Sequence, residues 1–291
     1  MIGVFSSDIY FENIYRSLED KGIKVDFLVT EGEKPGGRGL ALRQNPAYQF
    51  AKKIGLEVLT PSKMDNEFSV RLKDLILDNK TKVGFVYSYG KIISEEIINL
   101  FELGIINAHF SLLPRYRGSS PLQAALLNLD QKTGVTFFLI DKGLDTGRII
   151  KKEEIDIKTE DNFDTLKKTA LQKVTRILPQ TIKDYISGSI IPQEQEKEGV
   201  SCFGKIKKED GLISKNDDLK STLGKIRAFS SWPKAYLMID GKRIIIHSAK
   251  AINGQLEIER IQVEGKNPIA FSQFKNGYSV LLTRFPPYVK I

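Results

Sequence analysis

Short apolar runs alternate with amphipathic stretches along the first part of the chain. The apolar runs have the length of buried strands, and the amphipathic stretches repeat their apolar residues at helical spacing. This alternation predicts an α/β fold with a doubly wound, mostly parallel sheet. The predicted strands are Ile2–Phe5, Val25–Val29, Glu57–Leu59, Val83–Tyr87 and Gly104–Ala108, and the predicted helices are Phe11–Lys21, Pro46–Ile54, Glu67–Asn79 and Ser94–Phe101.

The pattern changes after Gly134. We predict β segments at Val135–Ile140 and Arg148–Ile157, which are joined by the polar loop Asp141–Gly147. A long helical pattern follows at Phe163–Tyr185.

The last third of the chain has a different character. Residues 188–200 are rich in Gly, Pro, Gln and Glu, which indicates an interdomain linker. Beyond it, short β-rich runs separated by Asp-Gly and Asn-Gly turns predict a small barrel. These runs are Ala235–Ile239, Arg243–Ser248, Leu256–Ile261, Ile269–Phe271 and Tyr278–Thr283. We therefore expect one domain at 1–187 and a second at 201–291.

The composition is typical of a soluble globular protein, with 41% hydrophobic and 27% charged residues among 291. The N-terminus lacks the basic region of a signal peptide, and no apolar stretch approaches the ~20 residues of a membrane helix. The single cysteine, Cys202, excludes an intramolecular disulfide and argues against a cysteine metal site. A cytoplasmic protein with no membrane partner is expected.

The net charge of +8 is unevenly distributed. Residues 201–291 contain 16 Lys and Arg against 8 Asp and Glu, so they carry the whole excess, and residues 1–200 are balanced. A charge-balanced N-terminal part and a basic C-terminal part suggest a catalytic domain joined to a surface that binds a polyanion. Basic residues that serve only solubility are the alternative.

The candidate chemistry lies where the Gly104–Ala108 strand ends, because ligands of open α/β sheets bind outside the carboxyl ends of strands. Asn107 and His109 are two residues apart, so in an extended chain their side chains leave from the same face. An amine that attacks a formyl carbon creates a negative oxygen, to which Asn107 and protonated His109 can both donate. Asp145 can orient His109, raise its pKa and help to move the amine proton.

Two neighbouring segments are candidates for the walls of this site. The turn Ser111-Leu112-Leu113-Pro114 offers backbone groups to a flat heterocycle, and Arg115 and Arg117 after it can meet carboxylates or phosphates. A solvated basic turn is the alternative for the two arginines. Ser88-Tyr89-Gly90 follows another strand and can edge the same pocket, although a plain strand-to-helix turn fits equally well.

The glycine-rich segment at residues 33–39 matches neither a dinucleotide fingerprint nor a P-loop. We interpret it as a mobile loop that carries Arg38 and Arg43. Such a loop can grip a nucleic-acid end; a flexible turn without that role is the alternative.

These motifs resemble the folate-dependent formyltransferase family, and within it the members that formylate methionyl-tRNA. The resemblance covers nearly the whole chain in the right order. It rests on Asn107-Ala108-His109, Ser111-Leu112-Leu113-Pro114-Arg115-Tyr116-Arg117-Gly118, Leu144-Asp145-Thr146-Gly147, Lys34-Pro35-Gly36-Gly37-Arg38-Gly39, Ser88-Tyr89-Gly90, Lys205–Asp210, Ile226–Phe229 and Trp232-Pro233.

The resemblance implies a Rossmann-like domain followed by an OB-like basic barrel that binds tRNA. It implies 10-formyltetrahydrofolate as donor, initiator methionyl-tRNA as acceptor in translation initiation, and no metal. Asn107, His109 and Asp145 match the family's catalytic residues. The folate-site segments are matched by Ser88–Gly90 and Ser111–Pro114, and the loop arginine that meets tRNA is matched by Arg38.

The chain departs from the family at three places. Ser6-Ser7-Asp8 replaces a Gly-Thr-Pro turn at the edge of the site. Leu40-Ala41-Leu42-Arg43 replaces the segment in which the loop usually carries two lysines, so contacts to tRNA can differ there. Leu212-Ile213-Ser214 replaces Ile-Asp-Trp in the second domain, which affects packing.

Three alternatives stay open. The first is a formyltransferase that acts on an amino-sugar nucleotide or on a purine-precursor amine. The second is a folate- or RNA-binding protein without turnover. The third is a 10-formyltetrahydrofolate hydrolase, which releases formate. We expect a monomer.

Overall fold

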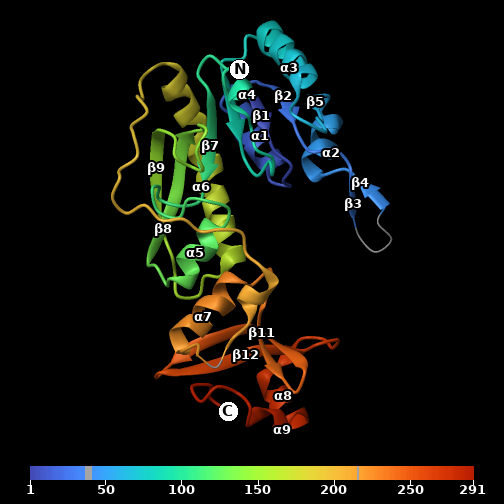
Figure 1. The fold of residues 1–291 in the computed structure, drawn as a ribbon, viewed down its shortest axis with the longest axis vertical. Coiled ribbons are helices and arrows are strands. Elements are labelled where there is room, and N and C mark those ends of the chain that lie inside the picture. Colours follow the sequence, from blue (N-terminus) through green and yellow to red (C-terminus); the bar gives the residue numbers. More distant parts are fainter. Residues whose placement is uncertain (37–40, 215) are drawn as a thin grey trace. The chain divides into compact units, whose positions relative to one another are not determined.

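The computed structural model describes residues 1–36, 41–214 and 216–291 (Figure 1). Its contacts divide the chain into two compact units. The first unit comprises residues 1–117, 134–153 and 170–200, and the second comprises residues 118–133, 154–169 and 201–291.

A seven-stranded sheet forms the framework of the first unit, in the order β5-β2-β1-β6-β7-β8-β9. The five strands from β5 to β7 are parallel, and β8 is antiparallel to β7. The predicted α/β class with a mostly parallel sheet is confirmed. The strands are β1 (Ile2–Phe5), β2 (Val25–Val29), β5 (Glu57–Leu59), β6 (Val83–Val86), β7 (Ile105–His109), β8 (Lys132–Leu139) and β9 (Ile149–Asp156).

Helices follow the strands of this sheet in chain order, as the apolar periodicity predicts. Ser94 is the N-cap of α4, with its hydroxyl accepting a bond from the amide of Ile97, and Asp65 caps α3 in the same way through Phe68. The helices are α1 (Phe11–Glu19), α2 (Pro46–Lys53), α3 (Asn66–Asn79), α4 (Glu95–Ile98) and α6 (Phe163–Ile186).

The core of the first unit explains why β1 and β6 lie at the centre of the sheet. Both strands are buried along their whole length. Phe5 contacts the rings of Tyr89 and Phe101 edge-on, with ring centroids 5.6 and 6.1 Å apart. This apolar packing fixes the carboxyl ends of the central strands, from which the candidate site residues project.

The second unit contains a four-stranded antiparallel sheet, β10-β11-β12-β13. An apolar core that includes Ile244, Ile261 and Phe274 lies on this sheet. Its elements are α5 (Pro121–Leu127), the 3-10 helix η1 (Lys208–Gly211), α7 (Leu219–Ala228), β10 (Ala235–Ile239), β11 (Lys242–Ile252), β12 (Gln255–Val263), β13 (Ile269–Ala270), α8 (Phe271–Gly277) and α9 (Ser279–Leu282).

The strand predicted at Tyr278–Thr283 is wrong, because these residues form the short helix α9. Tyr278 stacks on Phe274, with ring centroids 5.0 Å apart, and Leu281 and Leu282 pack against the same core. Val280 remains 80% exposed. A short apolar run does not by itself distinguish helix from strand, and packing on Phe274 decides the outcome here.

The segment predicted as a mobile loop contains two short strands, β3 (Lys34–Gly36) and β4 (Ala41–Arg43), which pair antiparallel. Arg38 lies outside the described residues. Arg43 lies on β4, where its backbone pairs with Lys34. Among the helices of the described residues, none is both long and apolar enough to span a bilayer.

Candidate active site

A cavity of about 420 Å³ opens where β6 and β7 end, at the carboxyl edge of the parallel sheet. One wall comes from Ser88-Tyr89-Gly90 after β6, and another comes from the loop between β8 and β9. Asn107 of β7 and Asp145 of that loop both line the cavity. The structure therefore brings these predicted residues together around one space. Apolar walls are supplied by Val86, Ile93, Phe138 and Ile140.

His109 lies at the end of β7 with both edges of its imidazole engaged. Its Nε2 lies 2.9 Å from the carbonyl oxygen of Tyr116, and its Nδ1 lies 3.6 Å from Oδ2 of Asp145. Because a carbonyl oxygen only accepts hydrogen bonds, Nε2 is protonated and donates a hydrogen bond to the carbonyl oxygen of Tyr116. The Nδ1 edge is thus left to face the carboxylate of Asp145.

Burial controls the charge of His109. The side chain is only 7% exposed, and Asp145 is 14% exposed. Desolvation is the largest influence and lowers the pKa of His109, whereas the charge of Asp145 and the bond to Tyr116 act to raise it. The resting imidazole is therefore neutral near pH 7. As expected from the sequence, Asp145 acts to raise the pKa of His109, but its effect is smaller than that of burial.

The loop that carries Asp145 is tightly built. Asp145 has a φ of +53°, in the left-handed region that Asp tolerates better than most residues. Earlier in the loop, Asp141 accepts bonds from the amide of Gly143 and the hydroxyl of Thr146, at 2.9 and 2.6 Å. At its end a Cβ on Gly147 would lie 1.7 Å from the carbonyl oxygen of Leu139, so only glycine fits.

The turn Ser111–Pro114 is placed beside the site rather than among the residues that line the cavity. The hydroxyl of Thr136 on β8 joins the carbonyl of Ser111, at 2.6 Å, to the amide of Leu113, at 3.1 Å. Leu113 is fully buried and packs with Phe138, which does line the cavity. Leu112 is partly buried, and Pro114 is buried. This turn supports the cavity wall from beneath.

The Ser88-Tyr89-Gly90 wall of the cavity contacts the Ser6-Ser7-Asp8 turn that follows β1. The hydroxyl of Ser88 donates to Asp8 over 3.3 Å. Tyr89 is 2% exposed, and its hydroxyl has no hydrogen-bond partner among the described residues. Burial, with a smaller effect of Glu31, raises the pKa of Tyr89. The phenol therefore stays neutral and supplies a polar group within a mainly apolar wall.

Gln195 is a residue of this site that the sequence did not reveal. It lies in the 188–200 segment predicted as a linker, where it is one of several polar residues in a run. Its amide nitrogen donates to the carbonyls of Asp145 and Gly147, at 2.8 and 2.9 Å. Its carbonyl accepts two bonds from Arg117, at 3.2 and 2.7 Å. Sequence spacing gives no signal for bonds between residues 48 to 78 positions apart.

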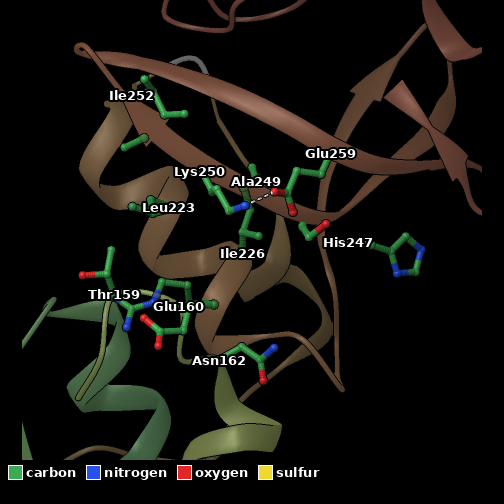
Figure 2. Close-up of a pocket in the computed structure, with 13 residues that line it drawn as sticks. Thr159, Glu160, Asn162, Leu223, Ile226, His247, Ala249, Lys250, Ile252 and Glu259 are labelled. Carbon is green, nitrogen blue, oxygen red and sulfur yellow. Dashed lines mark ion pairs between the residues drawn. The ribbon is translucent and has the colours of Figure 1, made fainter. Parts of the chain in front are cut away.

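The second unit has a cavity of its own, of about 460 Å³, which Figure 2 shows. It is lined by α7, β11 and the 159–162 loop, and Lys250 and Glu259 form an ion pair of 2.6 Å within it. His247, the other histidine of the chain, also lines this cavity and bonds to Gln262 over 2.7 Å. In the described parts of the chain, no cluster of three or more His, Cys, Asp or Glu residues could hold a metal ion.

Comparison with known proteins defines the class to which this fold and site belong. Residues 2–182 match the formyl transferase model, and residues 205–255 match the formyl transferase C-terminal domain model. The chain belongs to the formyl transferase family, and it is accordingly a formyltransferase.

Individual relatives agree with this assignment. The chain is 33% identical to methionyl-tRNA formyltransferase of Thermodesulfovibrio yellowstonii over 91% of its own length and 92% of the relative's. It is 36% identical to that of Caldanaerobacter subterraneus, with 81% of this chain and 76% of the relative covered.

Solved structures share the fold. Methionyl-tRNA formyltransferase from Clostridium thermocellum superposes with a TM-score of 0.59 at 19% identity, covering 90% of this chain and 97% of the other. An N-formyltransferase from Helicobacter canadensis, solved in complex with folinic acid and dTDP-3-aminofucose, gives 0.63 at 19% identity, with 92% and 97% covered.

Proposed function

We propose that the protein transfers the formyl group of 10-formyltetrahydrofolate to the α-amine of initiator methionyl-tRNA. The carrying observation is that Asn107 and Asp145 line the cavity of about 420 Å³, while His109, which does not line it, holds its Nδ1 3.6 Å from Oδ2 of Asp145. The names of relatives that are 33–36% identical over most of the chain support methionyl-tRNA as the acceptor.

The cavity suits a flat heterocycle. Phe138 and Ile140 supply apolar surface, and Ser88–Gly90 supplies backbone groups at the rim. A mainly apolar pocket with few polar groups is typical of small-molecule sites. We assign Ser88–Gly90 to direct contact with the folate and Ser111–Pro114 to support of the wall through Leu113 and Phe138.

Each catalytic residue then has a separate task. The amide of Asn107 donates to the oxygen of the attacked formyl group, where negative charge develops. The Nε2 edge of His109 is held by Tyr116, so its Nδ1 edge is the one that meets the reacting groups. Asp145 stabilises the imidazolium when His109 gains a proton, and it assists removal of the amine proton.

The transfer is balanced without a covalent enzyme intermediate. The amine nitrogen forms a bond to the formyl carbon, and the bond from that carbon to the donor nitrogen breaks. The amine loses one proton toward Asp145 and His109, and the donor nitrogen gains one. Neutral resting His109 suits this exchange, because it can accept a proton before it returns one.

The acceptor is proposed to bind through the basic part of the chain. Residues 201–291 hold the whole net charge of +8, Arg43 lies on β4, and Arg38 falls between β3 and β4 in the sequence. We propose that the 1–187 domain carries out formyl transfer, that 188–200 links the domains, and that 201–291 together with Arg38 and Arg43 holds tRNA phosphates. We further propose a cytoplasmic monomer.

The test is incubation of the purified protein with 10-formyltetrahydrofolate and charged initiator tRNA. Formyl-methionine on the tRNA is the expected product, with little formylation of elongator methionyl-tRNA. Parallel reactions contain a dTDP-linked amino sugar or no acceptor. Formylated sugar without formylated tRNA, or free formate as the main product, would overturn the proposal.

A further inference from the structure

The imidazole of His109 is held between two chain segments that are distant in sequence. The first is the turn after β7, whose Tyr116 carbonyl accepts from Nε2. The second is the loop after β8, whose Asp145 carboxylate faces Nδ1 at 3.6 Å. The relative position of these two segments therefore sets how far Asp145 lies from the ring.

The side chain of Gln195 joins these two segments. Arg117, the residue after Tyr116, donates from Nε and a terminal nitrogen to the carbonyl oxygen of Gln195. The amide nitrogen of Gln195 donates to the carbonyls of Asp145 and Gly147. The positive charge of Arg117 polarises the Gln195 amide and strengthens its bonds to these carbonyls.

Gln195 is itself held in place. The backbone of Gln193 pairs with Ile149 of β9 in both directions, at 2.7 and 2.8 Å. This short antiparallel bridge brings the 193–195 segment against the start of β9, directly after the Asp145 loop. The side-chain amide of Gln195 makes four hydrogen bonds, two to Arg117 and two to the carbonyls of Asp145 and Gly147. We call this set of four bonds the clamp.

We propose that Gln195 is a positioning residue, which sets the separation of His109 and Asp145 by tying Arg117 to the Asp145–Gly147 loop. The inference rests on the proposed catalytic function of that pair, and it assigns part of the predicted linker to the active site. Loss of the clamp lets Asp145 move away from Nδ1. A displacement of about 1 Å in a catalytic group can lower turnover by about 100-fold.

The first test measures turnover. Gln195→Met keeps the side-chain length without its hydrogen bonds, and Gln195→Glu keeps the acceptor for Arg117 but loses the donors to the two carbonyls. Both variants are expected to lower kcat by about 10- to 100-fold, with KM for the folate donor changed much less. Gln193→Met is the matched control, because the side chain of Gln193 is exposed and bonds only locally to Ile191. Wild-type kcat in Gln195→Glu would overturn the proposal.

The second test needs no activity. The chain has two histidines, His109 and His247, so an NMR titration of labelled imidazoles resolves both. The charged group that raises the pKa of His109 is Asp145, and the ring's other close neighbours, the Tyr116 carbonyl and the Phe138 ring, are neutral. In Gln195→Met the pKa of His109 is expected to fall further than in the wild type.

An unchanged titration of His109 in folded Gln195→Met would overturn the positioning role. Folding of each variant is checked by near-UV circular dichroism, and Gln195→Glu serves for the turnover test if Gln195→Met does not fold. If the wild type fails to formylate tRNA, the proposed function fails while the NMR result still decides whether Gln195 positions Asp145 against His109.

Discussion

The cavity beside Asn107 and Asp145 and the cavity beside Lys250 and Glu259 have similar volumes, about 420 and 460 Å³, but the ionisable pairs at them differ in burial. In the first unit the side chains of His109 and Asp145 are 7% and 14% exposed. In the second unit (Figure 2) those of Lys250 and Glu259 are 65% and 42% exposed. Water screens the second pair, whereas the first interacts in a poorly solvated site.

The difference shows that charged residues in a cavity do not by themselves make a reactive site. Lys250 and Glu259 form the shorter contact, at 2.6 Å, and neutralise each other at the surface. His109 and Asp145 are 3.6 Å apart, and burial keeps the imidazole neutral in the resting state. A proton can therefore move onto or off the buried pair during a reaction, whereas the exposed pair stays ionised and screened by water.

The largest expected effect comes from removing the carboxylate of the buried pair. Asp145→Asn preserves the shape of the side chain and its tolerance of the left-handed backbone, but it cannot hold an imidazolium or take a proton. We expect kcat for formyl transfer to fall by about 10²- to 10⁴-fold, measured under saturating substrates.

The second cavity supplies the control for this prediction. Glu259→Gln makes the equivalent carboxylate-to-amide change, and His247→Asn removes the other histidine. Both variants are expected to keep near-normal turnover. A loss of turnover in Glu259→Gln as large as that in Asp145→Asn would remove the distinction between the two cavities.

The sequence predicts which of the proposed catalytic residues lie together because their relation is local or follows from the sheet. Asn107 and His109 share one face of β7 and lie at its carboxyl end, as alternation and strand order require. Asp145 is assigned through its motif, and the structure places its carboxylate beside the ring. The strands β1, β2 and β5 have the predicted bounds, because their apolar runs are short and clearly delimited.

The sequence fails where tertiary contacts decide. The sequence indicates that Asp145 raises the pKa of His109, but it does not show the burial of the ring, which is the larger influence and lowers this pKa. The role of Gln195 depends on side-chain bonds to Arg117 and Asp145, which no periodicity encodes. The helix α9 depends on Phe274, whose ring stacks on Tyr278 and gives the following apolar residues a surface to cover.

The next largest effect concerns salt. If three or four tRNA phosphates are held by basic residues, the affinity for tRNA falls roughly 100-fold between 50 and 200 mM salt. Filter binding with initiator tRNA measures this slope. KM for the folate donor should change far less over the same range, because residues 1–200 carry no net charge. A flat salt response of tRNA binding would contradict a phosphate-contacting role for residues 201–291.

The smallest expected effect is on stability, and it tests the burial of His109. In the unfolded chain His109 titrates near pH 6.5, and burial lowers its pKa in the folded protein. Above about pH 7.5 the residue is neutral in both states and contributes no pH dependence. As the pH falls below about 6.5, the unfolded chain binds the proton first, so the free energy of unfolding decreases by up to about 1.4 kcal/mol per pH unit until the folded pKa is reached. Denaturation by urea at pH 7.5, 6.5 and 5.5 measures this slope, which should be shallower in His109→Asn. Equal slopes in the wild type and His109→Asn would mean that burial does not lower the pKa of His109. The buried and the exposed ionisable pairs would then not differ in the way proposed.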